Sequence, residues 1–201
     1  MSRSGFILDL GRCLGCGACV LACRLENHLP ERVSWRRVLP FNLDRYPGGP
    51  AYHFSLACNH CDRPACQFAC PAGAYQKRAD GIVLIDRNKC IGCRYCEMAC
   101  PFGAPSYDPD EGVMTKCHLC VDRVDIKLSP ACVDACPTEA LRLLQPGVMP
   151  ELSEAAWSGS LCQNMPGFVD PALCEPNIRF IPPRGQIRSR RLRKLQEALT
   201  K

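Results

Sequence analysis

Residues 90–105, CIGCRYCEMACPFGAP, place four cysteines within eleven positions and follow the last one with a proline. Three similar groups occur elsewhere: CLGCGACVLAC from residue 13, CNHCDRPACQFAC from residue 58, and CHLCVDRVDIKLSPACVDAC from residue 117. In chain order we call these groups cysteine sets one to four. They contain sixteen of the eighteen cysteines, so the chemistry of the chain is expected to lie in them.

Sets one and three share the spacing C-x2-C-x2-C-x3-C, which is typical of ferredoxins with two [4Fe–4S] clusters. The four iron corners of a cubane lie close together, so one tight loop can supply three thiolates. The fourth cysteine, which we expect at the start of a helix, ligates the other cluster. Sets two and four keep the terminal C-x3-C and lengthen the gap before it. A proline after the fourth cysteine of three sets suits a first helical turn, and Arg24 takes that place in set one.

Three other interpretations of the cysteines are weaker. Structural zinc usually takes two separated C-x2-C knuckles around one ion, whereas here three thiols are crowded into each short loop. Disulfides would have to join sulfurs two residues apart in a reducing compartment. Cysteines that serve only as small buried residues would not explain the spacing. The sequence therefore predicts iron–sulfur ligation.

Neither the N-terminus nor the hydropathy of the chain predicts export or a membrane span. MSRSGFILDL lacks the apolar core of a signal peptide and is interrupted by Asp9. No apolar run approaches the roughly 18 residues of a spanning helix. The pair Arg36 and Arg37 is internal, so it is not interpreted as an export signal. We expect a chain made in a reducing compartment, where clustered cysteines more often indicate metal or redox chemistry.

The sets could pair one with two and three with four, or they could be nested. Residues 71–89, between sets two and three, read as a short helix, a turn at Asp80 and Gly81, and a strand over residues 82–86. This connector is the one expected between the halves of a ferredoxin. GFILDLGRC before set one resembles GIVLIDRNKC before set three, and CPTEALRLL after set four resembles CPAGAYQKR after set two. The pattern favours an inner ferredoxin inserted within an outer one.

Nesting predicts four clusters with exchanged fourth ligands. The outer ligand groups are Cys13, Cys16, Cys19 with Cys136, and Cys117, Cys120, Cys132 with Cys23. The inner ligand groups are Cys58, Cys61, Cys66 with Cys100, and Cys90, Cys93, Cys96 with Cys70.

The same residues carry a family resemblance. The order of the four sets resembles that of the iron–sulfur subunit of dimethyl sulfoxide reductase and its relatives among molybdopterin oxidoreductases. So do SLACNHCDRPAC, CIGCRYCEMACPFGAP, MTKCHLCVDRV and the late EPNIRFIPP, over about residues 5–183. Some relatives have tryptophan in place of the third cysteine of set three and hold a three-iron cluster there. Cys96 occupies that place here, so the resemblance implies four cubanes.

The predicted function is electron transfer with no catalytic residue. Every cluster has four cysteine ligands, so no iron corner is open to a substrate. The resemblance implies anaerobic respiration in a complex with a large molybdopterin catalytic subunit and a membrane-anchor subunit that handles quinol. It implies a peripheral place at the cytoplasmic membrane, on either face, with no membrane span in this chain. The alternatives are the same relay in a formate dehydrogenase, a polysulfide or thiosulfate reductase or a hydrogenase, and a structural metal-binding protein.

Some residues outside the ligand sets also call for interpretation. Lys89 and Lys116 each precede the first cysteine of a set, as does Arg12, and the alternative to a solvated side chain is that one of these lysines raises the potential of its cluster. Cys162 and Cys174 are interpreted as non-ligand cysteines that could pair with each other. The histidines are scattered, so they predict packing or hydrogen bonding rather than a catalytic site.

The basic tail carries most of the net charge of +5, with seven basic residues against Glu197 in residues 184–201. Leu192, Leu195 and Leu199 would form one stripe of a helix. Such a helix could bind a partner, stay solvated, or contact anionic lipid. No aromatic platform accompanies the charge, so nucleic-acid binding is not predicted.

We therefore expect an α+β, loop-rich, ferredoxin-like fold whose folding depends on its clusters. The predicted inner unit spans residues 52–108, and the outer unit comprises residues 1–51 and 109–150. Residues 151–201 are expected to form a wrapping C-terminal extension with a basic helical tail.

Overall fold

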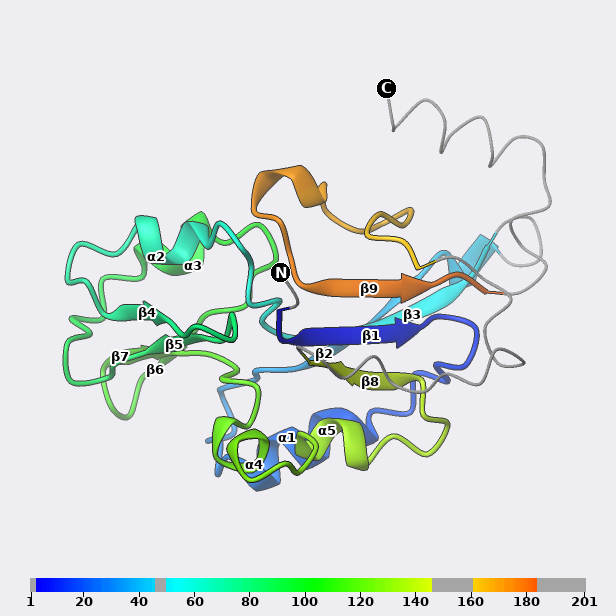
Figure 1. Cartoon of the computed structure of the whole chain (residues 1–201), viewed down its shortest axis with the longest axis horizontal. Helices are drawn as coiled ribbons and strands as arrows, with labels where there is room; N and C mark the ends of the chain where they lie inside the picture. Colours follow the sequence, from blue (N-terminus) through cyan, green and yellow to red (C-terminus); the bar gives the residue numbers. More distant parts are fainter. Residues whose placement is uncertain (1–2, 46–49, 146–160, 184–201) are drawn as a thin grey trace.

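The computed structural model describes residues 3–45, 50–145 and 161–183 (Figure 1). The α+β, loop-rich class is confirmed, since the described α-helices have four to nine residues and the strands three to five. The helices are α1 (Ala18–Glu26), α2 (Ala65–Phe68), α3 (Tyr95–Ala99), α4 (Val121–Asp125) and α5 (Ala131–Asp134). The predicted basic helix of residues 184–201 lies outside the described residues.

Nine strands form one three-stranded sheet and three hairpins in the described part of the chain. The strands are β1 (Gly5–Asp9), β2 (Arg37–Phe41), β3 (Tyr52–Leu56), β4 (Tyr75–Lys77), β5 (Val83–Ile85), β6 (Ser106–Asp108), β7 (Val113–Thr115), β8 (Leu141–Leu144) and β9 (Ile178–Ile181).

The sheet has the order β8-β1-β9 and joins segments far apart in sequence. Phe6 of β1 lies opposite Leu143 of the antiparallel β8 and opposite Ile178 of the parallel β9. Three successive residues of β1, from Phe6 to Leu8, are buried, so both faces of this central strand are covered. In Figure 1, helices α1, α4 and α5 lie together beside the edge formed by β8, and α1 packs against α5.

A second group of elements lies at the left of Figure 1 and consists of the hairpins β4–β5 and β6–β7 with α2 and α3. The helix expected directly after Pro71 is wrong, because Tyr75–Lys77 form strand β4, paired with Val83–Ile85 of β5. A turn over residues 71–72 uses up the start of the segment, and the remainder is too short for a helix. The Tyr75 side chain is buried, as an aromatic residue on a half-covered strand commonly is.

The hairpin β2–β3 and the C-terminal segment share an aromatic core. Phe41 and Tyr52 stack with ring centroids 4.9 Å apart, and Phe54 makes an edge contact with Phe180 of β9 at 5.6 Å. Phe168 packs against Phe180 at 4.8 Å. Although residues 161–183 follow all four cysteine sets, they thus belong to the main core of the protein.

In each cysteine set, the third cysteine lies in the first turn of a helix. Cys19, Cys66, Cys96 and Cys132 are each the second residue of a helix. The expectation that the fourth cysteine begins a helix is therefore wrong. Pro71, Pro101 and Pro137 follow the short helices instead of opening new ones, because proline disfavours helical geometry in the preceding residue and cannot donate to the helix. Arg24 has no such effect, and α1 continues to Glu26.

In the part of the chain that the structure describes, no helix has the length and apolar character needed to cross a membrane.

Candidate metal centres

One cavity is lined by Cys58, Cys61 and Cys66 of set two and by Cys100 of set three. These are the four thiols that the sequence assigns to one inner cluster. Cys66 reaches it from α2, and Cys100 reaches it from the end of α3, two helices that pack side by side.

A second cavity is lined by Cys13, Cys16 and Cys19 of set one and by Cys136 of set four. These four thiols are assigned to one outer cluster by sequence. Helices α1 and α5, which pack together, carry Cys19 and precede Cys136. The two cavities are similar in their three-plus-one arrangement of predicted ligand thiols, so they suit occupants of the same kind.

The other outer group is buried. Cys23 lies in α1, Cys132 lies in α5, and both belong to the main core together with Cys117. Burial, together with the nearby Cys132 and Cys120 thiols, raises the pKa of Cys23 to about 12. These contacts bring the fourth cysteine of set one close to set four.

The other inner group is only partly enclosed. Cys96, Cys70 and Cys90 lie in a small core cluster with Met114, whereas Cys93 is exposed and lies outside it. The loop before α3 requires glycine at position 92: Gly92 has φ 68, and a Cβ there would collide with the carbonyl oxygen of Gly112. The structure thus brings three of these four thiols into one cluster.

Backbone N–H groups point at several of the sulfurs in a repeated pattern. The fourth cysteines of sets two and three accept from the residue four positions later, Ala74 N to Cys70 Sγ at 3.4 Å and Ala104 N to Cys100 Sγ at 3.5 Å. The first cysteine of set four accepts from Leu119 N at 3.4 Å. Hydrogen bonds to sulfur favour the thiolate and influence the potential of a bound cluster.

The donor set fits a cluster better than a single ion. Among the described residues, no three His, Cys, Asp or Glu side chains converge closely enough to hold one metal ion. Each cavity is instead lined by the four thiols that the sequence predicts for one cubane, and the first cavity has a fifth, Cys174. Asn59 also lines the first cavity, is 1% exposed, and has no hydrogen-bond partner for its amide among the described residues. Its Nδ2 is a donor that a cluster sulfide would satisfy.

Burial of the thiols makes their ionisation depend on metal. Desolvation raises the pKa of Cys66 to about 12 and raises the pKa of Cys61 and Cys117 as well. Cys136 differs: burial would raise its pKa, but backbone N–H groups including that of Leu141 outweigh burial and lower it. Because iron binds the thiolate, loading the buried sites releases protons.

The three basic residues that precede cysteine sets have different surroundings. The Lys89 side chain is 63% exposed and lies 3.8 Å from Asp86, and Arg12 lies 4.0 Å from Glu139 at the surface. Lys116 is 1% exposed, and its Nζ donates to the carbonyl oxygens of Val83 and Cys117. Lys116 also lines the Cys58 cavity, so it faces the cluster site of set two rather than only its own set.

Sequence reasoning missed a second buried cation, Arg36, which is 1% exposed. Its Nη1 donates to the Ser55 Oγ at 3.0 Å, and that hydroxyl lies 3.2 Å from Cys19 Sγ. Nothing in SWRRV distinguishes Arg36 from its exposed neighbour Arg37. For Asn59, by contrast, its place between two cysteines in CNHC was an available signal.

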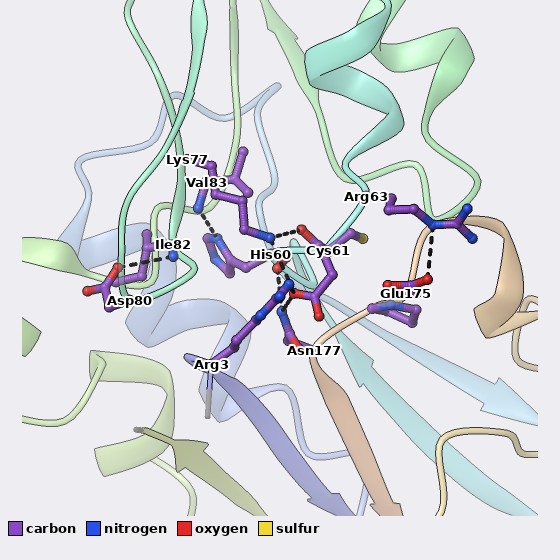
Figure 2. A network of polar contacts seen from close by, with 12 residues as sticks. Arg3, His60, Cys61, Arg63, Lys77, Asp80, Ile82, Val83, Glu175 and Asn177 are labelled. Atoms are coloured by element: carbon purple, nitrogen blue, oxygen red, sulfur yellow. Dashed lines mark hydrogen bonds and ion pairs between the residues drawn. The ribbon is translucent and has the colours of Figure 1, made fainter. Parts of the chain in front are cut away.

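A polar network holds the loop of set two in place (Figure 2). Asp62 accepts from Lys77 Nζ at 3.3 Å and from Asn177 Nδ2 at 2.9 Å, and it also pairs with Arg3. Asn177 Nδ2 donates to the carbonyl oxygen of His60 at 2.7 Å as well. The network joins the N-terminus, the cysteine loop and the start of β9, so EPNIRFIPP contributes to the site from a distance.

The two remaining cysteines are free thiols in different surroundings. Cys162 lies opposite Phe180 in an isolated bridge, with Sγ 3.6 Å from the Phe180 carbonyl oxygen. Cys174 is buried and lines the Cys58 cavity as a fifth thiol. The structure does not pair them with each other.

Comparison with known proteins gives matches over most of the sequence. The family described as 4Fe-4S dicluster domain matches residues 50–145, and the 4Fe-4S binding domain family matches residues 10–26. The protein is 45% identical to YnfG of Escherichia coli, a probable anaerobic dimethyl sulfoxide reductase subunit, covering 76% of this sequence and 77% of that protein. It is 47% identical to the B subunit of the anaerobic dimethyl sulfoxide reductase of Escherichia coli, over 70% and 72% of the two sequences. It is 39% identical to the thiosulfate reductase electron transfer subunit PhsB of Salmonella typhi, over 75% and 79%.

Proposed function

Since the protein belongs to the family of dimethyl sulfoxide reductase iron–sulfur subunits and their relatives, we propose that it holds four [4Fe–4S] clusters and relays electrons between two partner subunits. The protein is an electron-transfer subunit. The observation that carries the four-cluster proposal is the cavity in which Cys100 of set three completes the thiols of set two. A bound cluster accepts and returns one electron, and no other chemistry is required of it.

Sixteen thiolates would saturate the four clusters, so the chain itself has no catalytic residue. The outer ligands are Cys13, Cys16, Cys19, Cys136, Cys117, Cys120, Cys132 and Cys23. The inner ligands are Cys58, Cys61, Cys66, Cys100, Cys90, Cys93, Cys96 and Cys70. Cys162 and Cys174 are left without iron.

The proposed organisation is an inner ferredoxin-like unit nested in an outer one. The pairing of β1 with β8 and the packing of α1 on α5 support an outer unit built from both sides of the insertion. The packing of α2 on α3 supports the inner unit. We move the inner unit from residues 52–108 to residues 57–115, because the β2–β3 hairpin crosses the first boundary and the β6–β7 hairpin crosses the second.

Exposure of the ligands supports a relay with two ends. Cys16 of one outer group and Cys93 of one inner group are exposed, and the other fourteen ligands are buried or half-buried. The loop between β1 and α1 and the group that contains α3 lie toward opposite ends of the long axis in Figure 1. Electrons could therefore enter at one exposed cluster and leave at the other.

The proposed partners are a large molybdopterin catalytic subunit and a membrane-anchor subunit that handles quinol. The chain would then be a peripheral subunit at the cytoplasmic membrane. The similarity to a thiosulfate reductase subunit favours a second candidate, the same relay for a different sulfur substrate. Purifying the chain with its natural partners and identifying the metal and the substrate of the large subunit separates the two.

The cluster proposal is tested by metal analysis of the chain purified without oxygen. We expect about sixteen iron and sixteen acid-labile sulfide per chain, and reductive titration should take up about four electrons. Zinc in place of iron, or about eight iron, would contradict the proposal.

The pairing of the sets is tested by single substitutions. Cys136→Ser should perturb the electron paramagnetic resonance signal of the same cluster as Cys13→Ser, because both thiols line one cavity. Cys162→Ser is the matched control and should leave all four signals unchanged. If Cys136→Ser perturbs the cluster of Cys117 instead, the exchange of fourth ligands is wrong.

A further inference from the structure

Arg36 is a buried guanidinium with only part of its hydrogen-bonding capacity used. Its Nη1 donates to the carbonyl oxygen of Ser55 at 3.2 Å and to the Ser55 hydroxyl at 3.0 Å. The guanidinium carbon lies 4.5 Å from the centre of the Phe6 ring. Nε and Nη2 are buried and have no hydrogen-bond partner among the described residues. A buried charge left in this condition is costly unless a counter-charge lies nearby.

The available counter-charges are cysteine thiolates. No carboxylate in the described ranges forms an ion pair with Arg36. Burial would lower the pKa of Arg36, but the thiolate charges of four neighbouring cysteines outweigh burial and raise it. In order of effect these are Cys132, Cys117, Cys19 and Cys23. Cys19 belongs to one proposed outer cluster, and the other three belong to the second.

Ser55 connects the guanidinium to the first of these clusters. Its Oγ accepts from Arg36 and lies 3.2 Å from Cys19 Sγ. When Cys19 binds iron, its sulfur has no proton to donate, so the Ser55 hydroxyl must be the donor. Accepting from a cation and donating to a thiolate orients this hydroxyl in one direction. The Ser55 hydroxyl, oriented by the guanidinium, thus stabilises the negative charge on the Cys19 sulfur through a buried hydrogen bond.

We propose that Arg36 is a fixed buried cation shared by the two outer clusters and that it raises the midpoint potential of both. This inference rests on the four-cluster proposal. Reduction adds one negative charge to a cluster, and a nearby positive charge with little solvent around it stabilises that added charge. Arg36 acts through the ligand sulfurs, so it is a positioning residue and not a catalytic one. No inner ligand is among the four cysteines that act most strongly on Arg36, so the potentials of the inner clusters should not depend on it.

The test is a potentiometric titration of the full chain, purified without oxygen and followed by electron paramagnetic resonance. Arg36→Met keeps the side-chain length and removes the charge. We expect at least a tenfold fall in the one-electron reduction constant of two of the four clusters, which is about 59 mV for each. The other two midpoints should stay where they are. Unchanged midpoints in a variant with full iron content would overturn the proposal.

Two further variants keep the test decisive. Arg12→Met removes an exposed arginine beside Cys13 and should shift no midpoint. Ser55→Ala leaves the charge of Arg36 in place and should lower the midpoint of the Cys19 cluster only. If the Arg36→Met variant does not retain its clusters, the Ser55→Ala variant decides. An unchanged midpoint of the Cys19 cluster in Ser55→Ala would then overturn the proposal. A wild-type chain without four clusters would instead overturn the four-cluster proposal, and iron analysis distinguishes that failure from a missing shift.

Discussion

Lys116 and Lys89 hold the same place in sequence, directly before the first cysteine of a set, but differ in solvation. Lys89 is a surface side chain beside Asp86. Lys116 is buried, and its ammonium group lies between the carbonyl oxygens of Val83 and Cys117. A charge in water is screened, whereas a buried charge acts on its surroundings at a lower effective dielectric constant.

We therefore predict that Lys116→Met lowers the midpoint potential of the Cys58 cluster by roughly 60 mV, a tenfold change for one electron. The two carbonyl groups lose their donor, which should also cost about 1–3 kcal/mol of stability. Lys89→Met, the matched control, should change neither quantity measurably. Equal shifts in both variants, measured by redox titration, would show that burial does not decide the effect.

Spacing alone predicts which cysteines are ligands, because a cubane imposes a short repeat that is visible in sequence. The groups around the thiols were less accessible. Arg36 and Ser55 meet Cys19 only after β2, β3 and α1 have packed, and no local pattern records such a contact. The position of Lys116 directly before Cys117 is visible in the sequence, but the cavity that this lysine lines belongs to set two.

Helices α2, α3 and α5 obey one rule at the level of the element: the third cysteine of a set lies in the first turn, and a proline after the fourth cysteine prevents extension. Helix α1 is the exception, with nine residues, because Arg24 replaces that proline. The Arg24 side chain also donates to the carbonyl oxygens of Glu31 at 2.7 Å and Val33 at 3.2 Å. The substitution thus lengthens the helix and ties it to the following loop.

Arg24→Pro should destabilise the protein by about 3 kcal/mol more than Arg24→Ala does. Both variants lose the side-chain hydrogen bonds, but only proline removes a helical N–H and clashes with the preceding turn. Chemical denaturation followed by loss of visible absorption measures the difference. Similar midpoints for the two variants would mean that the last turn of α1 contributes nothing to stability.

Among the strands, prediction succeeded where the signal was local. The strand expected at residues 82–86 is present as β5, whose partner lies a few residues earlier. Strand β9 was not predicted, because its partner β1 is at the other end of the chain and the sequence gives no sign of that pairing. The segment 71–78 was assigned to a helix because its strand character depends on the hairpin and on the burial of Tyr75.

The whole molecule has a core that is partly made of its predicted cluster ligands. Cys19, Cys23, Cys58, Cys117 and Cys132 all lie in the main hydrophobic cluster. Buried cysteines pack against the apolar side chains of this core, and deprotonating them without iron is unfavourable. We therefore predict that cluster binding and folding are coupled.

Removing iron with a chelator under oxygen-free conditions should unfold most of the chain. We expect the far-ultraviolet circular dichroism signal to fall and sensitivity to protease to rise by at least about tenfold, and rebuilding the clusters should restore both. Cys162→Ser, which alters no ligand, should behave like the wild type. An iron-free chain that keeps its circular dichroism and its resistance to protease would contradict this coupling.

The pairing of β1 with β8 also limits how early the sheet can form during synthesis. A ribosome releases β1 first, yet the neighbour of that apolar strand is translated only after the whole inner segment has emerged. During this interval, the nascent chain exposes the apolar edge of β1 and three thiols whose predicted fourth co-ligand, Cys136, has not yet been translated. The second edge of β1 stays unpaired for longer still, because its partner β9 is complete only when translation has passed Ile181.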